Sequence, residues 1–88
     1  QRADNADLVR KKTRFFAERI RSTMAVDILE NVLSDDTVLT VARRTGMKEK
    51  EVEDILKRLR MDYCTEGNID DKEMKWAIDT INALTERI

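Results

Sequence analysis

A chain of 88 residues allows one small domain with a thin core, since folding at this length buries only about 60–65% of the unfolded surface. The 40% of charged residues, two glycines and no proline are typical of a helical domain, and no uncharged run is long enough for a membrane span, which argues against membrane insertion. The net charge of −1 conceals two unlike ends: residues 1–23 carry seven Lys/Arg against three Asp/Glu, and residues 61–88 carry three against seven.

The first predicted helical segment runs from Asp7 to Leu33, which contains neither Gly nor Pro and repeats apolar residues at helical spacing. One long helix or two short ones fit this pattern. Ser22 and Thr23 favour a break near Ser22, because a hydroxyl can cap the free amides of a second helix. The basic part of the segment could contact nucleic acid or anionic lipid, lie against the acidic C-terminal segment, or simply be solvated.

The next helix is predicted to start in the polar cluster from Ser34 to Thr37, where Asp35 or Asp36 can accept hydrogen bonds as the N-cap. Gly46 is predicted to end it, because glycine adopts the left-handed conformation at low cost. A further helix is predicted over Glu49–Arg60. Its apolar residues follow the i, i+3, i+4, i+7 pattern and are Val52, Ile55, Leu56 and Leu59.

The last helix has the clearest start signal. Asp70 can cap it, Glu73 stands three residues on as in a capping box, and Ile69 can pack onto Met74 as a hydrophobic staple. Its apolar stripe predicts that the helix docks firmly and consists of Met74, Ala77, Ile78, Ile81, Leu84 and Ile88. Trp76 falls off that stripe, so its indole either covers the rim of a neighbouring helix or meets a partner surface.

These segments predict an all-α fold, a compact bundle of four to five short amphipathic helices with a helix-turn-helix-like hairpin. Residues 1–88 are expected to form a single helical domain, and the start at Gln1 without a secretory signal suggests an excised or processed piece of a longer protein. The expected partner is the remainder of that polypeptide or another protein, with Trp76 as the candidate contact. The residues predicted to be buried are Val41, Val52, Ile55, Leu59, Met74, Ile78 and Ile81.

A small residue, a turn glycine and two apolar residues stand at Ala42, Gly46, Val52 and Ile55, in a pattern that resembles the helix-turn-helix family of DNA-binding domains over Val38 to Lys57. The residues that would contact nucleic acid in this interpretation are Arg43, Arg44, Lys48, Lys50 and Lys57. Acidic residues share the exposed face of the second helix, and carboxylates turned toward phosphates oppose the main favourable contribution to DNA binding. The segment therefore fits a helical hairpin better, with DNA binding as the alternative.

The loop from Asp62 to Glu73 has residues that match positions of an EF-hand calcium loop, namely Asp62, Gly67, Ile69 and Glu73. Cys64 replaces an oxygen ligand, and Glu66 is longer than the usual side chain at its position. A hard cation would lose coordination at both. The preferred interpretation is a capped loop that leads into the last helix, and no metal site is predicted.

A third pattern covers more of the chain. The stretch RRTGMKEKEVEDILKRLRMD, followed by EGNIDDKEMKWAIDTINAL, resembles the C-terminal helices of substrate-binding proteins of ABC importers of the nitrate, sulfonate and taurine type. The matching features are Thr45-Gly46, the stripe from Val52 to Leu59, the loop from Gly67 to Asp70 and the segment from Trp76 to Asp79. The resemblance implies a helical piece of a transport protein and carries over no ligand-binding residue, because the family's cleft lies between two α/β lobes.

No residue cluster predicts catalysis. The chain lacks histidine and a glycine-rich phosphate loop, and pairs such as Asp35/Asp36 are consecutive, as at helix starts. Cys64 is the only cysteine, so neither an internal disulfide nor a Cys/His zinc site is expected, and no cofactor is predicted. The leading hypothesis is a non-catalytic helical domain of a transport protein, which would be extracytoplasmic. The alternatives are a cytoplasmic DNA-binding regulator and a protein-interaction bundle with a degenerate EF-hand-like loop.

Overall fold

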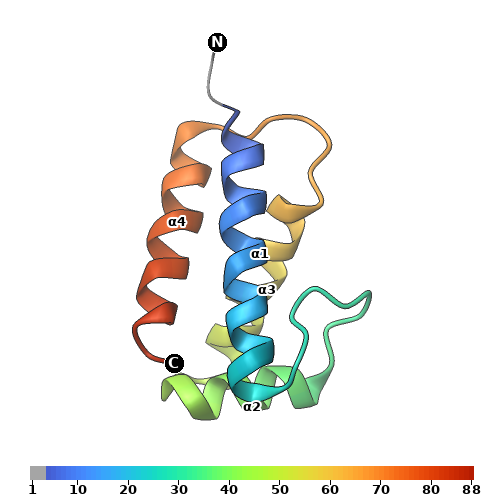
Figure 1. The fold of residues 1–88 in the computed structure, drawn as a ribbon, viewed down its shortest axis with the longest axis vertical. Coiled ribbons are helices and arrows are strands. Elements are labelled where there is room, and N and C mark those ends of the chain that lie inside the picture. Colours follow the sequence, from blue (N-terminus) through green and yellow to red (C-terminus); the bar gives the residue numbers. More distant parts are fainter. Residues whose placement is uncertain (1–3) are drawn as a thin grey trace.

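The structure is a computed structural model that describes residues 4–88. Over these residues the chain forms four α-helices and no strand: α1 (Asn5–Met24), α2 (Asp35–Thr45), α3 (Glu49–Tyr63) and α4 (Asp71–Thr85). The helices α1, α3 and α4 lie side by side along the long axis, and α2 lies across one end of them (Figure 1). The prediction of an all-α bundle is confirmed.

The first helix, α1, is a single helix that ends at Met24, near the predicted break. The Asp4 side chain caps it by accepting hydrogen bonds from the first free amides. The helix runs through Ser22 and ends at Met24, because Ala25 adopts the left-handed conformation (φ 61°) and turns the chain away. Residues 25–34 then form a loop, so the chain breaks near Ser22 as predicted, and of the two alternatives the segment contains one helix and not two.

Contacts with distant residues hold the loop of residues 25–34 in place. Ile28 is 1% exposed and belongs to the core, although it lies outside any helix. Arg60 on α3 donates hydrogen bonds to the carbonyl oxygens of Glu30 (2.5 Å) and Asn31 (2.7 Å). These bonds satisfy backbone groups that a helix would otherwise have paired internally, so the apolar spacing there reflects a packed loop.

The hairpin of α2 and α3 agrees with the prediction except at its ends. Ser34, and not Asp35 or Asp36, is the N-cap of α2, since its hydroxyl accepts from the Thr37 amide at 3.2 Å. The two aspartates lie in the first turn, where negative charge favours the helix dipole. Gly46 ends α2 in the left-handed conformation (φ 75°), as predicted. Helix α3 continues to Tyr63, beyond the predicted end at Arg60.

The start of α4 is confirmed at Asp70, whose side chain accepts a hydrogen bond from the Glu73 amide at 2.8 Å. The capping box is only half formed, because the Glu73 carboxylate pairs with Arg58 on α3. Hydrogen bonds also tie α4 to α1 at this end, where the Asn5 side chain donates to the Ile69 carbonyl (3.0 Å) and to the Asp71 carboxylate (2.8 Å).

The core lies between the three long helices and the inner face of α2. Four of the seven residues predicted to be buried are buried, and these are Val41, Val52, Leu59 and Ile81. The predictions for Ile55, Met74 and Ile78 were wrong, because these side chains are only half-buried. Their neighbours Leu56 (0% exposed) and Ala77 (0% exposed) take the central positions instead, since adjacent residues of a helix point about 100° apart.

No helix within residues 4–88 is long and apolar enough to cross a membrane.

Candidate functional site

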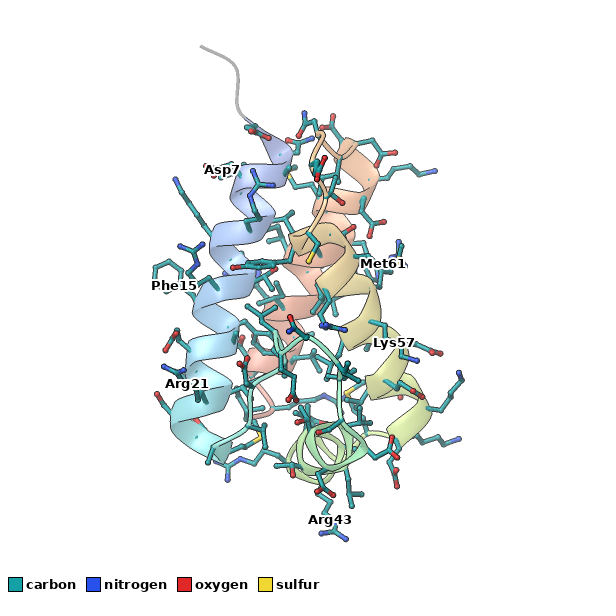
Figure 2. All side chains as sticks on the ribbon, turned by 90° about the vertical axis from the view of Figure 1, so that its right-hand side faces the viewer. Asp7, Phe15, Arg21, Arg43, Lys57 and Met61 are labelled. Atoms are coloured by element: carbon teal, nitrogen blue, oxygen red, sulfur yellow. The ribbon has the colours of Figure 1, made fainter. Side chains whose placement is uncertain are left out.

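The five residues predicted to contact DNA lie on two helices and the turn between them. Arg43 and Arg44 lie in the last turn of α2, Lys48 precedes α3, and Lys50 and Lys57 lie on α3. Figure 2 shows Arg43 at one end of the molecule and Lys57 farther along α3. The five cations are thus spread from the tip of the hairpin along the second helix.

Acidic neighbours neutralise part of this basic set. Lys50 pairs with Asp54 at 3.2 Å and Lys57 pairs with Glu53 at 3.0 Å, both one helical turn apart on α3. Such pairs reduce the positive charge that a DNA phosphate would meet.

Arg44 has a different partner, because its guanidinium donates to the carbonyl oxygen of Ile88 at 3.3 Å. Arg43 and Lys48 are exposed. DNA contact by the five residues stays a prediction, and Arg43 and Lys48 are the two that form no ion pair or side-chain hydrogen bond with residues 4–88.

The segment compared with an EF-hand adopts a different local structure. Asp62 belongs to α3 and is 7% exposed, so it does not begin a loop. Glu73 belongs to α4 and is held by Arg58. Within residues 4–88, no group of three His, Cys, Asp or Glu side chains is placed to hold a metal ion. The segment is therefore a helix end, a turn and a capped helix start.

A polar cluster joins the end of α3 to the start of α4. The Arg58 guanidinium donates two hydrogen bonds to the Glu73 carboxylate, from Nε at 2.9 Å and from Nη2 at 2.6 Å. This paired geometry is among the stronger side-chain interactions in proteins. The hydrogen bonds that Glu73 makes with Arg58, and a further one with Asp62, lower the pKa of Glu73. The hydrogen bond to Glu73 raises the pKa of Arg58.

Asp62 is the unusual member of this cluster. Burial of its carboxyl group, together with a hydrogen bond to Glu73, raises its pKa to about 7. Its Oδ2 atom is buried and accepts no hydrogen bond from any described residue. A proton on the Asp62 carboxyl group gives this buried group a hydrogen bond, because the protonated carboxyl group can donate to the Glu73 carboxylate. The arrangement is therefore a carboxyl pair that holds a proton near neutral pH.

Trp76 lies beside the same cluster. Its side chain is half-buried and packs against the core, and the Arg58 guanidinium lies 3.8 Å from the centre of its ring. This distance is that of a cation–π contact. The indole covers the rim of the core, and Arg58 covers one face of the indole ring. The aromatic side chain with the larger exposed surface therefore belongs to another part of the molecule.

That surface is the outer face of α1. Phe15 is 76% exposed and projects from α1 away from the bundle, on the side opposite to Lys57 and Met61 (Figure 2). Leu8, two turns earlier on the same side of the helix, is 45% exposed. The sequence of α1 carries six Lys/Arg against two Asp/Glu, an excess of basic residues found on no other helix of the fold.

A small groove opens beside Phe15, between α1 and α4. It has a volume of about 140 Å³ and is lined by Lys12, Phe15, Phe16, Arg19, Ile81 and Thr85. Phe16 and Ile81, each 2% exposed, belong to the core and give the groove an apolar floor. Lys12 and Arg19 flank Phe15 along the helix. We refer to these six residues as the α1–α4 groove.

Phe15 is not among the residues predicted from the sequence to form a site. The signal is present in the sequence, because Phe15 and Phe16 are adjacent in a helix and only one can follow the buried stripe. Thr13, Phe16 and Ile20 occupy that stripe and are buried, which turns Phe15 outward. An aromatic residue that the periodicity excludes from the core is a candidate for partner contact.

Comparison with known proteins identifies the family of this chain. No curated protein matches it, and no solved structure matches it. A family described as the DUF4350 C-terminal helical domain matches residues 1–88, the whole sequence. The description of that family as a helical domain agrees with the four-helix fold. The chain belongs to the DUF4350 C-terminal helical domain family.

Proposed function

We propose that this domain is a non-catalytic protein-binding module, and that it binds through the α1–α4 groove and the exposed side of Phe15. One observation carries the proposal: a phenylalanine that is 76% exposed stands at the edge of a groove with an apolar floor. Exposed apolar surface that adjoins a groove with an apolar floor is typical of interaction sites, whereas single exposed apolar residues are common. Aromatic residues beside pockets are frequent centres of binding energy in protein interfaces.

The other two hypotheses have less support from the geometry. The DNA-binding alternative relies on five cations, and two of them, Lys50 and Lys57, are paired with carboxylates on their own helix. The transport hypothesis relies on the resemblance of the segment from about Ser34 to Leu84 to importer binding proteins, and it names no ligand-binding residue that could be tested. The protein-binding proposal names a side chain and a groove, so it can be tested directly.

The experiment is a selection of binding peptides by the 88-residue chain from a displayed library of random amphipathic helical peptides. The proposal predicts that enriched peptides lose binding to Phe15→Ala and keep it to Val32→Ala. Val32 is a matched control, because it is 78% exposed and apolar but lies in the loop of residues 25–34. Peptides that bind Phe15→Ala as well as the unchanged protein would refute the proposal.

A further inference from the structure

We infer that the α1–α4 groove receives one apolar side chain from an acidic amphipathic helix of the partner protein, with carboxylates of that helix meeting Lys12 and Arg19. The inference rests on the proposed protein-binding function and adds the chemistry of the partner. Three observations support it: the size of the groove, the charges beside it and their spacing along α1.

The size of the groove suits a single side chain. Its volume of about 140 Å³ is close to that of a cavity that holds benzene, about 150 Å³. One leucine, isoleucine or phenylalanine of a partner would fill it and would cover Phe15 at its edge. Since the floor consists of Phe16 and Ile81, an apolar side chain is favoured over a polar one there.

The positive charges beside the groove favour an acidic partner. Two cations of α1 are paired within the helix, Lys11 with Asp7 at 3.2 Å and Arg21 with Glu18 at 3.4 Å. Among residues 4–88, Lys12 and Arg19 form neither an ion pair nor a side-chain hydrogen bond, although both line the groove. Their charges are therefore available to carboxylates of a partner, and complementary charge favours encounter with an acidic surface.

The spacing of these cations indicates a helix. Lys12 and Arg19 are seven residues apart, which corresponds to about 10.5 Å along α1 at a rise of about 1.5 Å per residue. A partner helix lying along α1 reaches both cations with acidic residues at positions i and i+7. The apolar residue that enters the groove then stands between them, at i+3 or i+4, on the same side of the partner helix.

The concave shape distinguishes a protein from the other anionic partners that a basic helix can attract. A membrane surface takes up protruding apolar side chains, and on α1 only Leu8 and Phe15 protrude. A groove with an apolar floor has no counterpart on a lipid surface or on duplex phosphates, but it fits a side chain presented by a helix. The acidic helix is therefore the occupant that uses the groove and both cations.

The test uses a fluorescein-labelled helical peptide of about 18 residues, roughly 27 Å long, with glutamate at i and i+7, leucine at i+4 and alanine or glutamine elsewhere. Anisotropy titrations against the 88-residue chain should show binding that weakens severalfold between low and physiological salt. Phe15→Ala should weaken it by about tenfold or more. Changing leucine to alanine in the peptide should have the same effect.

Exchange of charge tests the cations directly. The double variant Lys12→Glu/Arg19→Glu should no longer bind the glutamate peptide and should bind a peptide with lysine at i and i+7. Arg43→Glu, which changes an exposed cation on α2, is the matched control and should bind the glutamate peptide as before. Binding of the lysine peptide to the unchanged protein as tightly as the glutamate peptide would overturn the inference.

Three further outcomes would also overturn it. These are tighter Phe15-dependent binding to vesicles of phosphatidylcholine and phosphatidylserine, tighter Phe15-dependent binding to a random-sequence DNA duplex, and self-association that Phe15→Ala abolishes. Selected library peptides that depend on Phe15 but are not acidic would refute only the acidic partner and leave the proposed function standing. Selected peptides that do not depend on Phe15 would refute the proposed function itself.

Discussion

Arg58 holds Glu73 through two hydrogen bonds, of 2.9 and 2.6 Å, and the same guanidinium stacks on the ring of Trp76 at 3.8 Å. One arginine on α3 thus fixes both the first turn of α4 and the indole one turn later. This contact explains why Trp76, which the helical periodicity excludes from the core, is nevertheless half-covered. It also leaves the outer face of α1 as the more exposed aromatic surface.

The first prediction concerns this contact. Arg58→Ala should lower the free energy of unfolding by about 0.5–2 kcal/mol, a modest loss because the arginine side chain is partly exposed. Trp76 is the only tryptophan, so its fluorescence reports the change without interference. Removal of the guanidinium should expose the indole and shift its emission to longer wavelength. An emission spectrum that is unchanged in the folded variant would contradict the stacked arrangement.

The carboxyl pair predicts the pH dependence of stability. The raised pKa of Asp62, about 7, means that its contribution is present at acid pH and is lost as the pH rises through 7. The lowered pKa of Glu73 means that its contribution is lost only as the pH falls below the ordinary range of a glutamate. The free energy of unfolding should therefore fall by roughly 1–3 kcal/mol between pH 5 and pH 8.

Asp62→Asn separates this effect from other titrations. The asparagine amide can donate to Glu73 at every pH, as protonated Asp62 does, so the variant should be nearly as stable at pH 8 as at pH 5. Urea denaturation at the two pH values measures the difference. If Asp62→Asn shows the same loss of stability as the unchanged protein, the titrating group is not Asp62.

The difference in burial between Leu56 and Ile78 predicts which alanine substitution lowers the free energy of unfolding more. Leu56→Ala, at a position that is 0% exposed, should cost about 2–5 kcal/mol. Ile78→Ala should cost clearly less, about 1 kcal/mol, because Ile78 is only half-buried. Denaturant melts of both variants provide the comparison. Equal losses would show that Ile78 is as deeply packed as the sequence pattern alone suggests.

The start of α2 gives a test of the cap. Ser34→Ala should cost about 0.5–2 kcal/mol, because the Ser34 hydroxyl accepts from the Thr37 amide and also contacts the Thr37 hydroxyl at 2.9 Å. Asp35→Ala is the control and should cost only a few tenths of a kcal/mol, through the helix dipole. Thermal melts distinguish the two. A larger loss for Asp35→Ala would place the cap where the sequence first suggested it.

Local signals in the sequence were sufficient for most of the fold. Gly46 and Asp70 mark helix ends with side-chain or backbone properties that act over a few residues, and both predictions were confirmed. The loop of residues 25–34 could not be predicted in this way. Its apolar residues have helical spacing, but Arg60, far along the chain, bonds its carbonyl groups and Ile28 enters the core from it.

The candidate sites were harder to predict for a similar reason. The paired carboxyl groups of Asp62 and Glu73 belong to different helices, and they meet through the loop that joins α3 to α4 and the hydrogen bonds of Arg58 to Glu73. The α1–α4 groove likewise combines Phe16 with Ile81, which are distant in sequence. The exposure of Phe15, in contrast, follows from periodicity and could have been recognised from the sequence.

If the outer face of α1 is a protein-binding surface, a bound helix should leave its footprint there. Amide ¹H–¹⁵N spectra of the 88-residue chain, titrated with the glutamate peptide, report which residues the peptide contacts. We expect the largest shifts between Leu8 and Arg19 on α1 and around Ile81 on α4, with little change around Arg43 and Met61. Shifts centred on the α2–α3 hairpin, or none at peptide concentrations well above those of the protein, would contradict the account.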